Sequence, residues 1–185
     1  MLHKLKEKKG FTLLEVIISV AIFSIITIAL MTAFVNINKV YNKAIQVNYA
    51  QDLSANLIAK ASDELIFTMK AELSNDPSAA PAAGERMIFN DTSTDRVKVQ
   101  EGSEITDLLQ DTMYNKLRAE MEFTKVSDTV MKLDVRVYNP PRTTVLYSTS
   151  KSINMFSMEM TDGAGISGPV SETCDRVVYE HAASE

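Results

Sequence analysis

The stretch that decides the fold is Lys8–Val35, which reads KKGFTLLEVIISVAIFSIITIALMTAFV. From Phe11 to Val35 it contains no Gly or Pro, and Glu15 is its only ionisable residue. As a helix rising about 1.5 Å per residue, this segment covers roughly 37 Å, which exceeds the roughly 30 Å hydrocarbon core of a bilayer. A run of this length without alternation or turn residues predicts a transmembrane helix over residues 11–35 rather than a buried core helix or a strand.

The ten residues before this segment form a short basic leader, residues 1–10. They carry a net charge of +3 out of a total of -5, which leaves -8 for the rest of the chain. Since positive residues beside a membrane helix stay in the cytoplasm, we expect a cytoplasmic amino terminus and an extracytoplasmic carboxyl-terminal part. The apolar run is too long for a secretory signal peptide and lacks its cleavage pattern. The acidic main part gives no electrostatic reason to bind nucleic acid.

The motif Lys8-Lys9-Gly10-Phe11-Thr12-Leu13-Leu14-Glu15-Val16 resembles the processing and membrane signature of type IV prepilins and of the related pseudopilins. The resemblance implies that a prepilin peptidase cuts after Gly10, behind the basic residues Lys8 and Lys9, and methylates the new amine of Phe11. It makes Glu15 the fifth residue of the mature subunit. Many major pilins have proline where this chain has Thr32, so a break of the helix is less strongly encoded here. The sequence Leu14-Glu15-Val16 followed by Ala21-Ile22-Phe23 looks more like that of minor pilins and minor pseudopilins.

The residues of the motif also have physical readings of their own. Gly10 lets an extended backbone enter a narrow protease cleft, although it can equally be a breaker between the lysines and the helix. A charged Glu15 costs about 2.5–3.5 kcal/mol near the centre of a membrane helix and less near its edge. We therefore expect Glu15 to have a partner that sets the register of assembly, such as the amine of Phe11 in the same or a neighbouring subunit. The alternative is that its carboxylate reaches the membrane interface.

Residues 36–74 keep a helical pattern and are predicted to form an amphipathic spine helix that continues to Leu73. The apolar positions recur every three or four residues, at Val40, Ala44, Val47, Ala50, Leu53, Leu57, Ala61, Leu65, Met69 and Leu73. Such a helix must cover its apolar stripe, either on a sheet of the same chain or in a coiled-coil dimer. The drift from a strict seven-residue repeat favours the sheet.

Residues 75–160 are predicted to form a globular head with an antiparallel sheet, after a linker that contains Pro77 and Pro81. The predicted strands are 86–90, 96–100, 121–126, 130–138, 144–150 and 152–160, with a short helix over 105–117. The Gly-rich residues 161–185 are predicted to be a flexible tail. The expected fold class is α+β: a long amino-terminal helix, transmembrane in its first half and amphipathic in its second, packed on a small antiparallel sheet as in pilins.

The sequence offers little for catalysis, and we expect no enzyme activity, no cofactor and no metal site. Both histidines, His3 and His181, lie within five residues of an end of the sequence, and Cys174 is the only cysteine. Asp91, Ser93 and Asp95 place oxygens at alternate positions of a loop, but the glycine and glutamate of a calcium-binding EF-hand loop are missing. An ordinary solvated turn is the favoured interpretation there.

The leading hypothesis is that the chain is a structural subunit. It is held in the cytoplasmic membrane before it joins a surface or periplasmic filament of a type IV pilus or pseudopilus. The resemblance implies four kinds of partner: a prepilin peptidase, other pilins, an assembly ATPase with its membrane platform, and the membrane itself. The rival hypothesis is an extracytoplasmic binding domain or enzyme that is tethered by an uncleaved helix.

Overall fold

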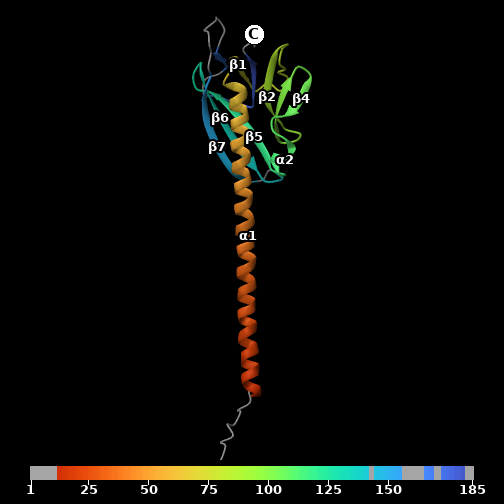
Figure 1. The fold of residues 1–185 in the computed structure, drawn as a ribbon, viewed down its shortest axis with the longest axis vertical. Helices are drawn as coiled ribbons and strands as arrows, with labels where there is room; N and C mark the ends of the chain where they lie inside the picture. The colour runs from red at the N-terminus through yellow and green to blue at the C-terminus, as the bar shows by residue number, and fades with distance from the viewer. Residues whose placement is uncertain (1–11, 142–143, 156–164, 169–171, 182–185) are drawn as a thin grey trace, which may run out of the picture. The chain divides into compact units, whose positions relative to one another are not determined.

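The computed structural model describes residues 12–141, 144–155, 165–168 and 172–181. The chain divides into two compact units, residues 1–45 and residues 46–185. Helix α1 (Leu13–Leu65) begins in the first unit and ends in the second. The described part of the first unit is helical from Leu13 onward, whereas the second unit combines the last part of α1 with strands (Figure 1).

The second unit contains a six-stranded sheet in the order β4-β3-β2-β10-β1-β8. Its members are β1 (Thr68–Ser74), β2 (Glu85–Asp91), β3 (Arg96–Glu101), β4 (Glu104–Asp107), β8 (Gly165–Ser167) and β10 (Arg176–His181). All neighbouring strands are antiparallel except β1 and β8, which run parallel. The strand β10 therefore lies between β1 and β2, although these two follow one another in the sequence.

A four-stranded antiparallel sheet has the order β7-β6-β5-β9. It consists of β5 (Arg118–Lys125), β6 (Val130–Tyr138), β7 (Val145–Asn154) and β9 (Thr173–Cys174). One turn of helix, α2 (Asp111–Tyr114), precedes β5. Within the second unit, the last part of α1 lies against the sheet of β5, β6 and β7 (Figure 1). The α+β class and the helix on a largely antiparallel sheet are confirmed, with two sheets in place of the expected one.

The core is built from alternate residues of the strands and one stripe of α1. In β5 and β6 every second side chain is buried, including Met121, Phe123, Leu133 and Val135. The polar residues between them face outward, as the two-residue period of a half-buried strand requires. The buried stripe of α1 comprises Ala50, Leu53, Ser54, Leu57, Ile58, Ala61, Ser62 and Leu65. The predicted spine is thus confirmed from Ala50 to Leu65.

The predicted helix end at Leu73 is wrong, because α1 ends at Leu65 and residues 68–74 form β1. The hydroxyl of Thr68 donates a hydrogen bond to the Leu65 carbonyl at 2.8 Å, which satisfies one of the carbonyls left open at a helix end. In β1 the buried residues Ala71 and Leu73 are two apart. The spacing of Leu65 and Leu73 fits a strand after the turn as well as a helix, so periodicity alone could not separate them.

The predicted helix over 105–117 is also wrong. Gly102 has a φ of +58°, and the turn there returns β4 along β3. The helical part is confined to α2, which ends because Asn115 and Lys116 have left-handed backbone angles of +44° and +67°. The two predicted strands 144–150 and 152–160 correspond to the single strand β7 (Val145–Asn154), and residues 156–160 lie outside the described residues.

The predicted flexible tail 161–185 is wrong for the residues that the structure describes there, since they form β8, β9 and β10. In β10 the side chains of Val177 and Tyr179 are buried, which is the pattern of a strand in a core. The glycines and the proline between 163 and 169 dominated the composition of this segment and hid the strand that follows.

Two asparagine side chains connect the sheets. The Asn90 amide donates to the Met121 carbonyl at 2.7 Å and accepts from the Met121 N–H at 2.8 Å, so β2 of one sheet is bound to β5 of the other. The Asn75 side chain binds the crossover from β9 to β10 in the same way. Its amide donates to the Thr173 carbonyl at 3.1 Å and accepts from the Asp175 N–H at 2.9 Å. Each amide replaces a pair of strand hydrogen bonds where the two sheets meet.

Candidate functional site

The sequence predicts the candidate site at the start of α1, and the structure describes it from Thr12 onward. The predicted residues Lys8, Lys9, Gly10 and Phe11 lie outside the described residues. The predicted residue Glu15 is described, and it belongs to the first turn of α1.

Thr12 and Glu15 form a reciprocal capping box at the start of the helix. The Thr12 N–H donates to Glu15 Oε2 at 2.8 Å and the Thr12 hydroxyl donates to the same oxygen at 3.0 Å. In return the Glu15 N–H donates to Thr12 Oγ1 at 3.3 Å. Two of the N–H groups that every helix leaves open at its start are thereby satisfied by side chains.

The capping box gives Glu15 a partner within its own turn, which the sequence reasoning missed. The signal was present in the sequence, because Thr-Leu-Leu-Glu directly before an apolar run is the T-x-x-E pattern of such a cap. A carboxylate at the amino-terminal end of a helix is also favoured by the helix dipole. Glu15 therefore has a structural role that does not require a second subunit, and Thr12 joins it as a site residue.

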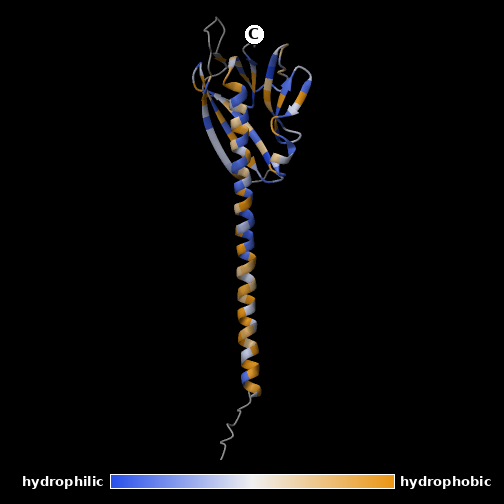
Figure 2. Ribbon diagram, in the orientation of Figure 1, coloured by the Kyte–Doolittle hydropathy of each residue, from blue (hydrophilic) through white to orange (hydrophobic). Residues whose placement is uncertain are grey.

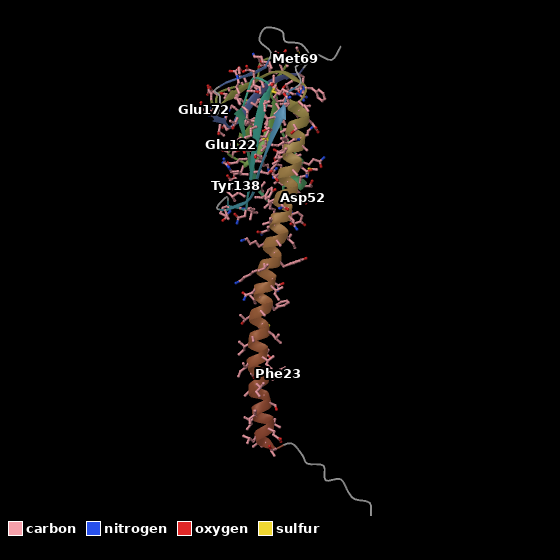
Figure 3. The ribbon with its side chains drawn as sticks, turned by 90° about the vertical axis from the view of Figure 1, so that its left-hand side faces the viewer. Phe23, Asp52, Met69, Glu122, Tyr138 and Glu172 are labelled. Carbon is pink, nitrogen blue, oxygen red and sulfur yellow. The ribbon has the colours of Figure 1, made fainter. Side chains whose placement is uncertain are left out.

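The helix after this cap presents apolar side chains on all sides. The large apolar residues between Leu13 and Val35 are all exposed, from 48% for Val16 to 80% for Leu13. Figure 2 shows this part of α1 in the colour of hydrophobic residues over most of its surface, and Figure 3 shows Phe23 pointing away from the helix axis. A surface of this kind needs lipid or an apolar partner around it. Among the described residues, α1 is the helix that is long and apolar enough to cross a membrane.

The hydroxyl groups in this apolar segment are bonded within the helix. Ser19, Ser24, Thr27 and Thr32 each donate to the backbone carbonyl four residues earlier, at distances between 2.7 and 3.0 Å. Since an unpaired donor in hydrocarbon costs several kcal/mol, these bonds make the segment compatible with lipid despite its polar residues. Thr32, which stands where many major pilins have proline, leaves the helix uninterrupted.

Comparison with known proteins identifies this segment. Residues 5–31 match the family described as the prokaryotic N-terminal methylation motif. The amino-terminal segment is type IV pilin-like. The matched residues contain Thr12 and Glu15, so the capping box is part of the pilin-like segment, and the apolar helix that follows has the character of a membrane anchor.

The rest of the chain has weaker likenesses. A variant of the PilB minor pilin from Streptococcus sanguinis is similar in structure, with a TM-score of 0.48 and 9% sequence identity. The match covers 69% of this chain and 33% of that protein, so the chain spans about a third of its length. No curated protein matches the sequence significantly. The family comparison therefore concerns the pilin-like segment and not the second unit.

The loop 91–95, whose alternating oxygens were considered as a calcium site, is a turn with hydrogen bonds between its own residues. The Asp91 carboxylate accepts hydrogen bonds from the N–H and hydroxyl of Ser93 and from the hydroxyl of Thr94, and it pairs with the Lys98 ammonium at 2.6 Å. The Lys98 ammonium and the Ser93 bonds hold the pKa of Asp91 well below its usual range. A carboxylate occupied in this way is a poor calcium ligand, and no group of three metal-ligating side chains occurs among the described residues.

Cys174 lies in β9 with 2% of its surface exposed. Burial and the nearby carboxylates raise the pKa of its thiol, which keeps it protonated and unreactive at neutral pH. The buried thiol packs as a small apolar side chain of the core.

Proposed function

We propose that this chain is a prepilin-type structural subunit, cleaved after Gly10, methylated at Phe11 and assembled into a type IV pilus or a related pseudopilus. The match of residues 5–31 to the methylation motif carries the proposal, and the fully exposed apolar surface of the helix that follows supports it. Before assembly the helix is held in the cytoplasmic membrane, with the leader in the cytoplasm and the second unit outside. In the filament the same apolar surface packs against other subunits.

The proposal has consequences for partners. Cleavage and methylation need a prepilin peptidase, whereas extraction from the membrane needs an assembly ATPase working through a membrane platform. Since the pilin-like segment carries the assembly surface, other pilins are its direct partners. Thr32 and the absence of a helix break favour a minor subunit.

Mass spectrometry of the amino terminus of the protein from its native host tests the processing step. We expect a mature chain that begins at Phe11 and carries one methyl group on its amine. A native chain that begins at Met1, or one that is cut near Ala33, would contradict the proposal and favour the rival, an uncleaved membrane tether on a binding domain or enzyme.

We assign Glu15 a second role as the residue that sets register during assembly. The amine of a processed Phe11 lies about four residues, or roughly 6 Å, from Glu15 along the helix axis. In hydrocarbon an unpaired charge is costly, so a stagger that pairs the amine of an incoming subunit with the Glu15 carboxylate of an assembled one is favoured over other staggers.

Two substitutions separate the register role from the capping role. Glu15→Gln keeps an acceptor for the capping box but loses the charge, and Glu15→Val loses both. We expect both variants to be inserted and cleaved, and both to show a lower ratio of filament-borne to membrane-held protein than the wild type. Recovery of full incorporation by Glu15→Gln would assign the residue to capping alone. A block in cleavage would place it in peptidase recognition instead.

A further inference from the structure

A hollow of about 650 Å³ lies in the second unit where connections from both sheets meet. The turn from β2 to β3, the link from α2 to β5 and the end of β6 border it. Its lining includes Ser93, Thr94, Arg96, Lys116, Arg118 and Pro140, and no carboxylate belongs to it among the residues that the structure describes. Three cations line this hollow in a chain whose net charge is -5, and the carboxylates that pair with its two arginines lie outside the lining.

The guanidinium of Arg96 is held in place by three neighbouring side chains. It pairs with Asp107 at 2.8 Å and with Asp111, and it lies 5.0 Å from the centre of the Tyr114 ring. Because these contacts fix its position, the group loses little freedom when a ligand accepts one of its remaining N–H donors.

The guanidinium of Arg118 is fixed in a similar way. Its Nη1 donates to the Thr94 carbonyl at 2.5 Å and lies 3.6 Å from the Asp95 carboxylate. The carboxylates paired with the two arginines therefore neutralise much of their charge. Lys116 is exposed and has no ion-pair or hydrogen-bond partner among the described residues, so it supplies the uncompensated positive charge of the hollow.

Residues in or beside the hollow have unusual, left-handed backbone conformations. Asp95, Asn115 and Lys116 have φ values of +52°, +44° and +67°, and they are the described non-glycine residues with positive φ. All three lie in the hollow's lining or next to a lining residue in the sequence. Such conformations concentrate at ligand sites, where the surrounding structure holds them.

We propose that this hollow binds an acidic saccharide through the carboxylate of one sugar unit. A single uncompensated ammonium suits a ligand with one negative charge per unit. The hydroxyls of Ser93 and Thr94 donate to Asp91, so their oxygens are left as acceptors, and together with the spare guanidinium donors they suit a ligand rich in hydroxyl groups. The volume lies within the usual range for small-ligand sites. A nucleic acid fits less well, because the lining offers no aromatic ring for base stacking and the chain is acidic overall. The inference does not depend on the proposed function.

The test is a titration of the full chain in detergent micelles with galacturonate oligomers of four to six units. The matched neutral ligand is the same oligomer with its carboxylates methyl-esterified. We expect the acid to bind at least about tenfold more tightly than the ester, as the loss of one charge-assisted hydrogen bond predicts. Lys116→Gln is expected to weaken binding of the acid by a similar factor, and Lys116→Arg to restore most of it.

Lys70→Gln is the control, because it removes one exposed lysine from β1, outside the hollow, with the same change of net charge. Thermal unfolding of each variant checks that the second unit is intact. Equal affinity of the wild type and Lys116→Gln, equal affinity for acid and ester, or no binding at millimolar acid would overturn the proposal. Tighter Lys116-dependent binding of a sugar phosphate or of an oligo-dT strand would overturn the assignment to a carboxylated sugar.

Discussion

The two units of the chain use apolar residues in opposite ways. Phe23 in the first unit is 70% exposed, whereas Phe123 in the second unit is fully buried. The second unit buries a core of apolar side chains between its own strands and helix, so the stability of that core comes from contacts within the chain. The first unit leaves its apolar side chains for lipid or other subunits, so its environment must be supplied from outside.

The carboxylates of the two units also differ in where their partners lie in the sequence. In the first unit Glu15 is bonded to Thr12, three residues away. In the second unit Glu64 of α1 pairs with Arg86 of β2 at 3.0 Å and lies 3.4 Å from His181 of β10, so one carboxylate joins three elements. Local bonds stabilise the start of a helix whose apolar surface is exposed, while long-range bonds fix one tertiary arrangement.

The largest expected effect compares the two phenylalanines directly. Phe123→Ala leaves a cavity in the core and should destabilise the second unit by about 3–5 kcal/mol. Phe23→Ala should change the unfolding of the second unit by less than about 0.5 kcal/mol, since it removes no contact there. Denaturant unfolding of both variants in micelles measures the difference. Similar losses of stability would mean that the two units do not differ in this way.

The next effect concerns the connection between the sheets. Asn90→Ala leaves the Met121 N–H and carbonyl without their partner and should cost about 2 kcal/mol. Asn42→Ala, at an exposed position of α1 in the first unit, should stay within about 0.5 kcal/mol of the wild type. Thermal unfolding of the pair provides the measurement, and an unchanged midpoint for Asn90→Ala would show that the sheets hold together without this amide.

A smaller effect depends on pH. Because the pKa of Asp91 is lower in the folded chain than its usual value near 3.9, the ionised carboxylate stabilises the folded state above that pH. Asp91→Asn should therefore cost about 1 kcal/mol at pH 7, and the difference should begin to shrink as the pH falls below about 4, because the carboxyl group of the unfolded chain is protonated there while that of the folded chain stays ionised to lower pH. Unfolding curves at pH 7 and pH 3 test this, and a difference that does not depend on pH would assign the effect to shape and not to charge.

The smallest effect is expected at the start of α1. Thr12→Val removes the hydroxyl of the capping box and should loosen the first turn by about 1 kcal/mol or less, while Thr12→Ser should preserve it. Hydrogen exchange of the first-turn amides in lipid reports the change. Faster exchange that spreads into the second unit would show that the units are more tightly coupled than their separate packing indicates.

The sequence predicted some of these features well because two signals agreed. The strands β5 and β6 combine strict alternation with the turn residues Ser127 and Asp128. The predicted bounds of β6 are confirmed, whereas β5 begins at Arg118, three residues before its predicted start. Beyond Leu65 the spacing of apolar residues fitted both a helix and a strand, and only the pairing of β1 with β10 decides between them. Pairing between residues a hundred positions apart leaves no local signal.

The candidate site shows the same division. The pilin-like segment could be predicted because its signals are continuous in the sequence, while the roles of Gly10 and Phe11 stay predictions. The capping role of Thr12 was not predicted, although the sequence contains the T-x-x-E pattern, because the same residues also belong to the processing motif. The hollow beside Lys116 could not be predicted, since its lining comes from three separate connections.

The position of β10 makes the second unit divisible into two pieces. Strands β1 and β2 lie two strand spacings apart, about 9.6 Å, and β10 fills the place between them although residues 176–181 are synthesised after both. A chain stopped before Thr173 would leave that place open, and a separate peptide of residues 173–181 has the pairing groups to fill it. A labelled peptide of residues 173–181 would therefore bind to truncated subunits and show where subunits of this protein are found.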